Sequence, residues 1–154
     1  MTIFHHQWKN LQTILLMSAL CSLLSCCSTL PPTRLKSILI SAEIDANQDT
    51  ATAIDFVFVY NRDAIPFLPK TGPAWFAQKF LIQSSLASNI DVVSVEIPPS
   101  TNVDVPLPSR HGKAIAVYSF VNYINVNGQY AGNLTSYEDV QIVLTPNTVL
   151  YKIN

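Results

Sequence analysis

The chain has 154 residues and a mass of 17.0 kDa, which leaves room for one domain of ordinary size. Nine basic residues against ten acidic ones give a net charge of -1, and this balance argues against nucleic acid as the main partner. Charged residues make up only 12% of the chain and hydrophobic residues 49%, so the composition is not that of a disordered protein.

The first 25 residues have the pattern of a signal peptide. Met1–Asn10 is polar and carries one lysine, Lys9, whereas residues 11–24 are mostly apolar. An apolar run of this length suits the core of a signal peptide and is short for a membrane-spanning helix, which needs about 20 residues. We therefore expect residues 1–25 to direct export and to be absent from the mature protein.

The end of this segment, Leu23-Leu24-Ser25-Cys26, resembles the lipobox of bacterial lipoproteins. An aliphatic residue stands three positions before the cysteine, and a small residue stands directly before it. Cleavage there would leave Cys26 as the first mature residue, with lipid on its thiol and amine. Two alternatives stay open: lipid on Cys27 instead, or a plain secretory signal, although an Ala-x-Ala-like cleavage site is not evident.

Lipidation would fix the location of the mature protein. In Gram-negative bacteria an Asp directly after the lipidated cysteine tends to retain a lipoprotein in the inner membrane, and Cys27 stands there instead. We therefore expect a lipid-anchored protein of the outer membrane that faces the periplasm. Residues 26–34 form a short tether containing Pro31-Pro32, and 35–154 form the folded domain. With Cys27 as the one remaining thiol, the mature chain cannot form an internal disulfide.

From Leu35 onward apolar residues alternate with polar ones, which is typical of half-buried β-strands. Residues 114–121 are apolar on both faces, which indicates a strand in the middle of a sheet. Phe58 and Val117 lie on strongly apolar strand faces and are predicted to be buried. Strand-like alternation is seen in the ranges 38–44, 54–61, 92–97 and 102–107, and further strands are expected over 140–144 and 148–153.

Two turns and one helix complete the predicted elements. Asn127-Gly128 is the strongest hairpin signal, and Pro146-Asn147 can form a tight turn between the last two strands. A helix is expected from Gly72 to about Ala87, because Pro73 suits the first helical position.

Helical spacing places Phe76, Phe80 and Ala87 on one face with Ala77 and Leu81, and Asn89 is the expected C-terminal cap. Trp75 is interpreted as a packing residue that seats the helix on the sheet. The order of strands and helix predicts a mostly β fold, a two-sheet β-sandwich with a short helical insertion.

Residues for catalysis are scarce, so the chain is not expected to be an enzyme. Beyond Cys27 it has no cysteine and one histidine, His111, in an apparent surface turn. No spacing typical of a metal site and no Gly-rich phosphate loop is present. We therefore expect no cofactor, no metal and no catalytic group.

Several motifs together resemble the lipoprotein of type VI secretion systems, the TssJ or SciN family. In this short chain the lipobox is followed by an expected strand, then by Asn47-Gln48-Asp49, and then by the alternating strand Phe56-x-Phe58-x-Tyr60-Asn61. Phe67 and Trp75-Phe76 match a Phe-bearing helical segment, and residues 114–120 match a later strand of small and aromatic residues. One departure is Gly128–Gly132, where many family members carry a Trp-Arg-like pair.

The resemblance implies a transthyretin-like sandwich with a structural function. Family members sit under the outer membrane and bind the periplasmic part of the inner-membrane protein TssM, and with TssL they build a trans-envelope complex. They contact TssM through the loop between their first two strands. By position, the contacting residues here would be Ala46, Asn47, Gln48, Asp49 and Thr50.

Two other functions remain open from the sequence. One is a periplasmic-facing lipoprotein with a ligand-binding or chaperone-like sandwich, unrelated to secretion, which a deep apolar pocket would favour. The other is an enzyme, which would require His111 in a cleft beside a carboxylate and a hydroxyl group. For the loop at Ala46–Thr50, an ordinary solvent-exposed connection without function is the alternative.

Overall fold

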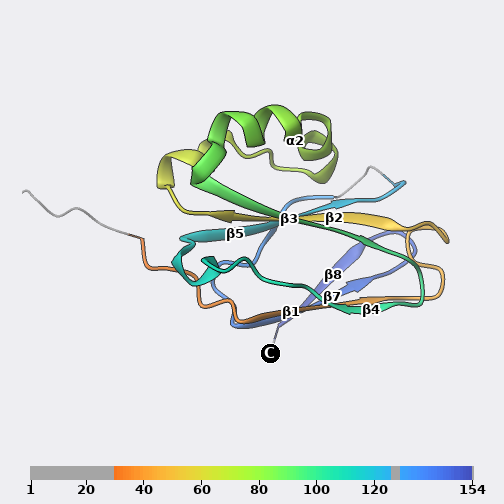
Figure 1. Ribbon diagram of the computed structural model, residues 1–154. Helices are drawn as coiled ribbons and strands as arrows, with labels where there is room; N and C mark the ends of the chain where they lie inside the picture. The colour runs from red at the N-terminus through yellow and green to blue at the C-terminus, as the bar shows by residue number, and fades with distance from the viewer. Residues whose placement is uncertain (1–29, 126–128, 154) are drawn as a thin grey trace, which may run out of the picture.

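The computed structural model describes residues 30–125 and 129–153, and their strands form two sheets packed face to face (Figure 1). One sheet has the strand order β4-β1-β7-β8 and the other β3-β2-β5-β6. The predicted two-sheet sandwich is therefore confirmed. The strands are β1 (Ser37–Ala42), β2 (Thr52–Val59), β3 (Ile90–Ile97), β4 (Asn102–Asp104), β5 (Ala116–Asn122), β6 (Gly132–Asn133), β7 (Asp139–Leu144) and β8 (Val149–Ile153).

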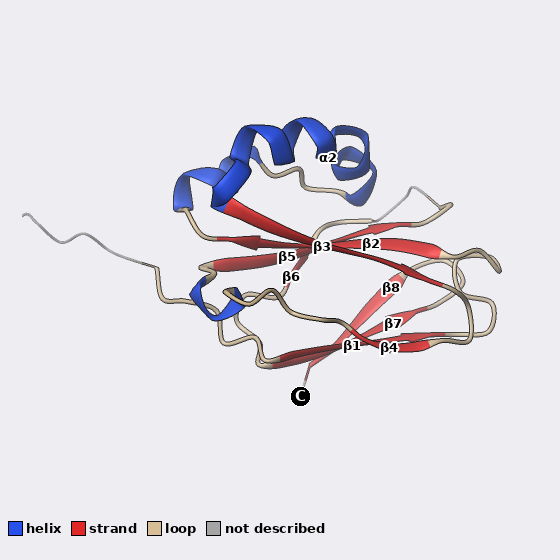
Figure 2. Cartoon of the chain, in the orientation of Figure 1, coloured by secondary structure: helices blue, strands red, loops and turns tan. Residues whose placement is uncertain are grey.

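The helical insertion forms a third layer outside the β3-β2-β5-β6 sheet (Figure 2). Helix α2 spans Gly72–Leu86, and Thr71 caps its start by accepting a hydrogen bond from the backbone N–H of Ala74. Pro73 occupies the first turn, as predicted, because its missing N–H has no partner there in any helix. The helix ends at Ala87, which has a positive φ of 38°, so the expected cap at Asn89 is wrong.

The main core lies between the two sheets and follows the alternation of the sequence. Phe58 and Val117 are fully buried in it, as predicted. Val140 and Ile142 of β7 face them from the other sheet together with Ile38 of β1. The alternation of apolar and polar residues predicts these buried positions correctly, because one face of each of these strands contacts the main core.

A second core lies between the sheet and α2, and it corrects two expectations. Strand β2 was expected to be half-buried, but Val57 and Val59 on its outer face are buried under the helix. The helix face was also assigned wrongly, because Phe80 is 83% exposed and Leu81 is exposed as well. The buried face instead carries Gly72, Trp75, Ile82 and Leu86.

The first strand lies inside its sheet between β4 and β7. It runs parallel to β7, with Ser37 opposite Asp139 and Ala42 opposite Leu144, whereas all other strand pairs are antiparallel. The chain therefore enters the domain at one end of the sandwich, runs along β1, and reaches the opposite end at Ala42 (Figure 1).

We call these the tether-side end and the distal end. At the tether-side end Thr33 donates a backbone hydrogen bond of 2.6 Å to Ala114. At the distal end the connection between β1 and β2 meets the β3–β4 and β7–β8 turns, through Ser100 N–H to Glu43 and Asn47 N–H to Thr145. The β1–β2 connection crosses from one sheet to the other, since β1 and β2 belong to different sheets.

Some predictions fall outside the described residues. These are the signal peptide at 1–25, the lipid site at Cys26 or Cys27, and the hairpin at Asn127-Gly128. The predicted turn at Pro146-Asn147 does connect β7 and β8, and the N–H of Thr145 donates to the carbonyl of Thr148 across it. Among the helices of the described ranges, none has the length and apolar character needed to cross a bilayer.

Candidate functional site

The loop predicted to contact a partner has an unusual backbone. Asn47, Gln48 and Asp49 adopt φ values of 49°, 55° and 60°, which is the left-handed region. A single residue there is uncommon outside glycine, although Asn and Asp tolerate it best, and three in a row form a tight left-handed turn. The turn lies in the connection that crosses from one sheet to the other at the distal end of the sandwich (Figure 1).

Asn47 fixes this loop to its neighbours. Its side chain is only 2% exposed, and its Oδ1 accepts a hydrogen bond of 2.8 Å from the backbone N–H of Ile124. Its own N–H donates to the carbonyl of Thr145, and its Nδ2 donates to that of Ala51 at 3.4 Å. Asn47 thus joins the loop to the segment after β5 through its side chain and to the β7–β8 turn through its backbone, which fixes the conformation of the distal end.

The loop residues named from the sequence divide into two groups. Ala46 and Asn47 are buried, whereas Gln48, Asp49 and Thr50 are exposed. The structure therefore leaves three of the five side chains in reach of a second molecule. The buried position of Asn47 could not be read from the sequence, because polar loop residues are usually solvated and its partner Ile124 is 77 residues away.

Apolar and acidic side chains surround the exposed loop residues. Ile44 is 79% exposed and Ile124 is 55% exposed, both at the distal end. Glu43 and Asp45 are exposed on either side of Ile44. Exposed apolar groups with a polar rim are the composition of a protein–protein contact. Sequence reasoning missed Ile44, because alternation assigned it to the buried face of the first strand, which ends at Ala42.

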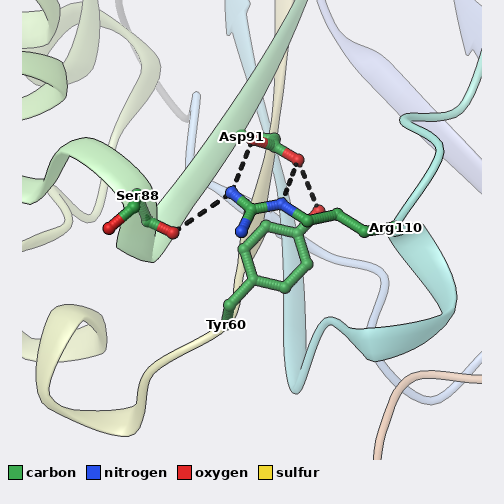
Figure 3. A network of polar contacts seen from close by, with 4 residues as sticks. All are labelled: Tyr60, Ser88, Asp91 and Arg110. Carbon is green, nitrogen blue, oxygen red and sulfur yellow. Dashed lines mark hydrogen bonds and ion pairs between the residues drawn. The ribbon is translucent and has the colours of Figure 1, made fainter.

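A network of polar contacts holds the tether-side end together (Figure 3). Arg110 donates from Nε and Nη2 to both carboxylate oxygens of Asp91, each at 2.8 Å, and from Nη2 to the carbonyl of Ser88. Its guanidinium carbon lies 3.8 Å from the centre of the Tyr60 ring, and the Tyr60 hydroxyl donates to Asp91. The network ties the ends of β2 and β3 to the connection between β4 and β5.

The pKa values of Asp91 and Tyr60 are both shifted in this network. Hydrogen bonds from Arg110 lower the pKa of Asp91 below its ordinary value. Burial, followed by the hydrogen bond to Asp91, raises the pKa of the Tyr60 hydroxyl. Both shifts stabilise the protonation states already present at neutral pH, an ionised carboxylate and a neutral phenol. The network therefore acts as a structural clamp rather than as a proton donor.

A buried carboxylate lies under helix α2. Asp55 on β2 is 1% exposed. Its carboxylate accepts a hydrogen bond of 2.7 Å from the indole N–H of Trp75 and forms an ion pair of 3.2 Å with Lys79. The Trp75 ring stacks on Phe120 with centroids 4.7 Å apart. Trp75 is thus a packing residue, as predicted, and its N–H has a second task that the sequence did not indicate, the satisfaction of a buried charge.

His111 bonds through its ring to a backbone carbonyl and not to a carboxylate or hydroxyl group of the described residues. It lies in a short 3₁₀ turn at His111–Lys113, half-buried, with Nδ1 2.9 Å from the carbonyl of Pro108. The acidic pair Glu138 and Asp139 bonds instead to Lys36 and Ser37. Within residues 30–125 and 129–153 no cluster of three or more His, Cys, Asp or Glu could hold a metal ion.

Two surface grooves flank the helical layer. One has a volume of about 410 Å³ and is lined by Pro66, Pro69, Tyr118 and Tyr130 among others. The second, of about 370 Å³, lies between Phe67 and the outer face of α2 at Leu81. Both lie outside the main core, whose inward-facing side chains are buried against one another between the sheets.

The predicted tether is already held by the domain before its expected end. Thr33 is buried, and besides its bond to Ala114 its hydroxyl donates to the carbonyl of Thr135 at 2.9 Å. Leu35 is buried in the main core. Thr33 is therefore fixed to the domain, two residues before the expected start of the folded part at Leu35.

Comparison with known proteins finds similarity in structure alone. No protein-family model and no curated protein matches the chain. The T6SS lipoprotein TssJ1 from Pseudomonas aeruginosa is similar with a TM-score of 0.58 and 14% identity, over 80% of this chain and 98% of that one. Serratia marcescens Lip, a membrane-bound component of the type VI secretion system, is similar with a TM-score of 0.54 and 13% identity, over 80% of this chain and 98% of that one.

A third similar chain comes from the structure described as the T6SS protein TssM C-terminal domain (869–1107) from EAEC. Its TM-score is 0.54 at 13% identity, over 76% of this chain and 99% of that one. Identities this low establish the architecture and not the partners. The matched chains are covered almost completely, so the similarity concerns the whole fold rather than one motif. This chain therefore has the β-sandwich fold of the TssJ-type lipoproteins of type VI secretion systems, as the sequence motifs predicted.

Proposed function

We propose that the protein is the outer-membrane lipoprotein of a type VI secretion complex. Lipid on Cys26 holds it in the outer membrane facing the periplasm, and its distal end binds the periplasmic domain of an inner-membrane TssM-like protein. It acts as a structural link and not as an enzyme. The shared fold of TssJ1 and Lip supports the family-level part of this proposal.

One observation carries the proposal: the tether and the candidate loop lie at opposite ends of the same strand. Thr33 precedes β1 and the loop follows it, with six strand residues between them, or roughly 20 Å at 3.3 Å per residue. A domain held at Thr33 by a lipidated tether would present Gln48, Asp49 and Thr50 away from its membrane. That is the direction from which an inner-membrane partner must approach.

The contacts assigned to the loop can be stated more sharply than from the sequence. Gln48, Asp49 and Thr50 are proposed to contact the partner, with Ile44 and Ile124 as apolar neighbours. Asn47 is proposed as a positioning residue, because its buried side chain bonds to Ile124 rather than facing solvent. Deleting the whole loop would destroy these bonds and would not separate binding from folding.

The test is co-purification with the periplasmic domain of the TssM-like protein from the same genome. The variant carries Gln48→Gly, Asp49→Gly and Thr50→Ala, since glycine adopts the positive φ of the first two positions without strain. Ala87→Gly is the matched control, because Ala87 is exposed with a positive φ of 38° at the end of α2. We expect the loop variant to lose the partner and the control to keep it.

Circular dichroism and the thermal midpoint establish that both variants fold. A folded loop variant that still captures the partner at wild-type level would remove Gln48–Thr50 from the interface. Failure of the wild-type protein to bind the domain at all would count against the proposed function itself.

A further inference from the structure

The charged side chains of the sandwich are divided between its two ends. The distal loops at 43–51, 98–101, 122–125 and 145–148 carry Glu43, Asp45 and Asp49, all exposed, and these stretches contain no lysine or arginine. The tether-side end carries five basic residues: Arg34, Lys36, Arg62, Arg110 and Lys113. The domain is therefore acidic at the end proposed to bind a partner and basic where the tether leaves.

Two of the four acidic groups near the tether-side end form ion pairs with basic side chains. Both oxygens of Asp91 accept hydrogen bonds from Arg110, and Glu138 forms an ion pair of 2.6 Å with Lys36. Asp63 follows Arg62 in the chain, and Asp139 accepts a hydrogen bond from the hydroxyl of Ser37. The five basic residues against the four acidic ones leave this end with one net positive charge, and Arg34 and Lys113 are exposed basic side chains for which no ion pair is seen among the described residues.

The backbone segments that carry these two basic residues are joined by a hydrogen bond. The 2.6 Å hydrogen bond from the N–H of Thr33 to the carbonyl of Ala114 joins the residue before Arg34 to the residue after Lys113. The bond fixes Thr33, a residue of the expected tether, to the domain. The positive charge thus sits at the root of the tether, the part of the domain that cannot move far from the anchor.

The length of the tether sets how close this end is to the bilayer. From Cys26 to Thr33 a fully extended chain reaches at most about 24 Å, at roughly 3.4 Å per residue. Any less extended conformation brings the end nearer. At physiological ionic strength charges interact over about 8 Å. A tether that is shorter than its fully extended length by part of these roughly 24 Å would bring the basic side chains within that distance of the headgroups.

We propose that the tether-side end docks on the anionic phospholipid headgroups of the membrane that holds the anchor, with Arg34 and Lys113 as the contacts. The inference rests on the lipid anchor of the proposed function and not on the TssM-like partner. Each basic side chain close to an anionic surface strengthens binding about five-fold. Glu43, Asp45 and Asp49 are repelled by the same surface, so the charge distribution also orients the distal end away from it.

The mature lipidated chain carries its own probe for this docking. Trp8 belongs to the signal peptide, which leaves Trp75 as the one tryptophan, and Trp75 is held rigidly under α2. The protein is reconstituted in phosphatidylcholine vesicles and in vesicles that also contain phosphatidylglycerol, both with dansyl-labelled headgroups. Energy transfer from Trp75 reports how the domain sits relative to the surface.

We expect energy transfer to differ between the neutral and the anionic vesicles at low salt, and the difference to vanish at high salt. The double variant Arg34→Gln, Lys113→Gln should give the neutral-vesicle value on both. Lys70→Gln, an exposed lysine away from this end, is the matched control and should behave like wild type. Unchanged thermal midpoints exclude unfolding of the variants.

Three outcomes separate the possibilities. Equal transfer on both vesicle types at low salt would overturn the docking and leave the basic end to an acidic protein surface. A difference that survives Arg34→Gln, Lys113→Gln would overturn these residues as the contacts. Loss of the chain from neutral vesicles would count against the lipid on Cys26, and co-sedimentation with anionic vesicles, abolished in the double variant, would then decide the docking alone.

Discussion

Asp91 and Arg110 are 19 residues apart in the chain, and both oxygens of the carboxylate accept a hydrogen bond of 2.8 Å from the guanidinium (Figure 3). Two-point pairing fixes the relative orientation of the two groups as well as their distance. Arg110 belongs to the connection from β4 to β5, whereas Asp91 opens β3 at the edge of the other sheet. The pair therefore holds a long irregular segment against the edge strand β3 through side chains.

The pH dependence of stability should report this pair. The pKa of Asp91 is lowered in the folded protein, so its contribution to stability is complete above the unfolded value of about 3.9 and is lost as the pH falls through the folded value. Asp91→Asn should lower the free energy of unfolding at pH 7 by about 1 kcal/mol or less, since the pair is partly exposed.

Urea unfolding from pH 7 down to pH 3 checks this prediction. The difference between wild type and Asp91→Asn should stay constant down to about pH 5 and shrink below about pH 4. Asp104→Asn, an exposed residue on β4, is the control and should leave the unfolding free energy unchanged. A difference between wild type and Asp91→Asn that is independent of pH would show that Asp91 acts through packing.

The main core can be tested with two phenylalanines of opposite exposure. Phe58 is fully buried between the sheets, whereas Phe80 is 83% exposed on α2. Phe58→Ala should cost about 3–5 kcal/mol of unfolding free energy, because the lost contacts leave a cavity. Phe80→Ala should change it by less than about 0.5 kcal/mol. Equal thermal midpoints for wild type and Phe58→Ala would show that Phe58 is not on the buried face of its strand.

Helix α2 approaches strand β5 so closely that only glycine fits at the contact. A Cβ on Gly72 would lie 2.0 Å from the carbonyl oxygen of Val121, a backbone atom that cannot rotate away. Gly72→Ala should therefore destabilise the protein by about 1–3 kcal/mol or more through overpacking. At Gly112 a Cβ meets no atom within 4 Å, so Gly112→Ala should be neutral in the same thermal unfolding assay.

Alkaline unfolding should depend on Tyr123. Burial raises the pKa of its hydroxyl to about 12, and the hydroxyl donates to the carbonyl of Thr148 at 2.9 Å. An unfolded tyrosine ionises near pH 10, so the unfolded state loses its proton first and stability falls as the pH rises from about 10 to 12. For this one residue the loss is at most about 3 kcal/mol.

Tyr123→Phe removes that titration. The variant should be less stable than wild type at neutral pH by about 1 kcal/mol, for the lost hydrogen bond, and should lose less stability above pH 10. Tyr130→Phe changes an exposed side chain and should keep the wild-type slope. Parallel curves for wild type and Tyr123→Phe above pH 10 would contradict the assignment.

The lipid anchor makes a direct chemical prediction. Cys26→Ser should abolish incorporation of radioactive palmitate and remove the protein from the outer-membrane fraction. Cys27→Ser is the matched control and should retain the label. Label retained on Cys26→Ser and lost on Cys27→Ser would move the anchor by one residue, and label retained on both would leave neither cysteine as the sole site.

The sequence predicted those features that depend on neighbours along the chain. Alternation identified the buried faces around Phe58 and Val117, and Pro73 marked the start of the helix, because each signal is local. It did not identify the buried face of α2. Apolar residues occur all round this helix, and Lys79, at helical spacing from the buried Trp75 and Ile82, is half-buried and forms an ion pair with Asp55 from another element.

Contacts between distant segments were not predictable in the same way. The role of Asn47 depends on Ile124, which follows a different strand, and the exposure of Ile44 depends on where β1 loses its neighbours. The family resemblance predicts the loop as a contact site, whereas the burial of Asn47 is evident only from the three-dimensional structure. Nothing in the spacing of polar residues distinguishes an asparagine that faces solvent from one that faces a backbone N–H.

The parallel pairing of β1 with β7 has a consequence for how the chain acquires its fold. Ser37 pairs with Asp139, so about a hundred residues must be made before the first strand meets this neighbour, and its other neighbour, β4, pairs Leu39 with Asp104. Chains are synthesised from the N-terminus, and pairings this distant in sequence form slowly. The first of these strands to emerge thus waits for neighbours that are made much later, and its apolar residues Ile38 and Ile40 stay available to other chains during that interval. A holding chaperone would therefore act on the segment next to the tether, and faster export than folding would make aggregation begin there.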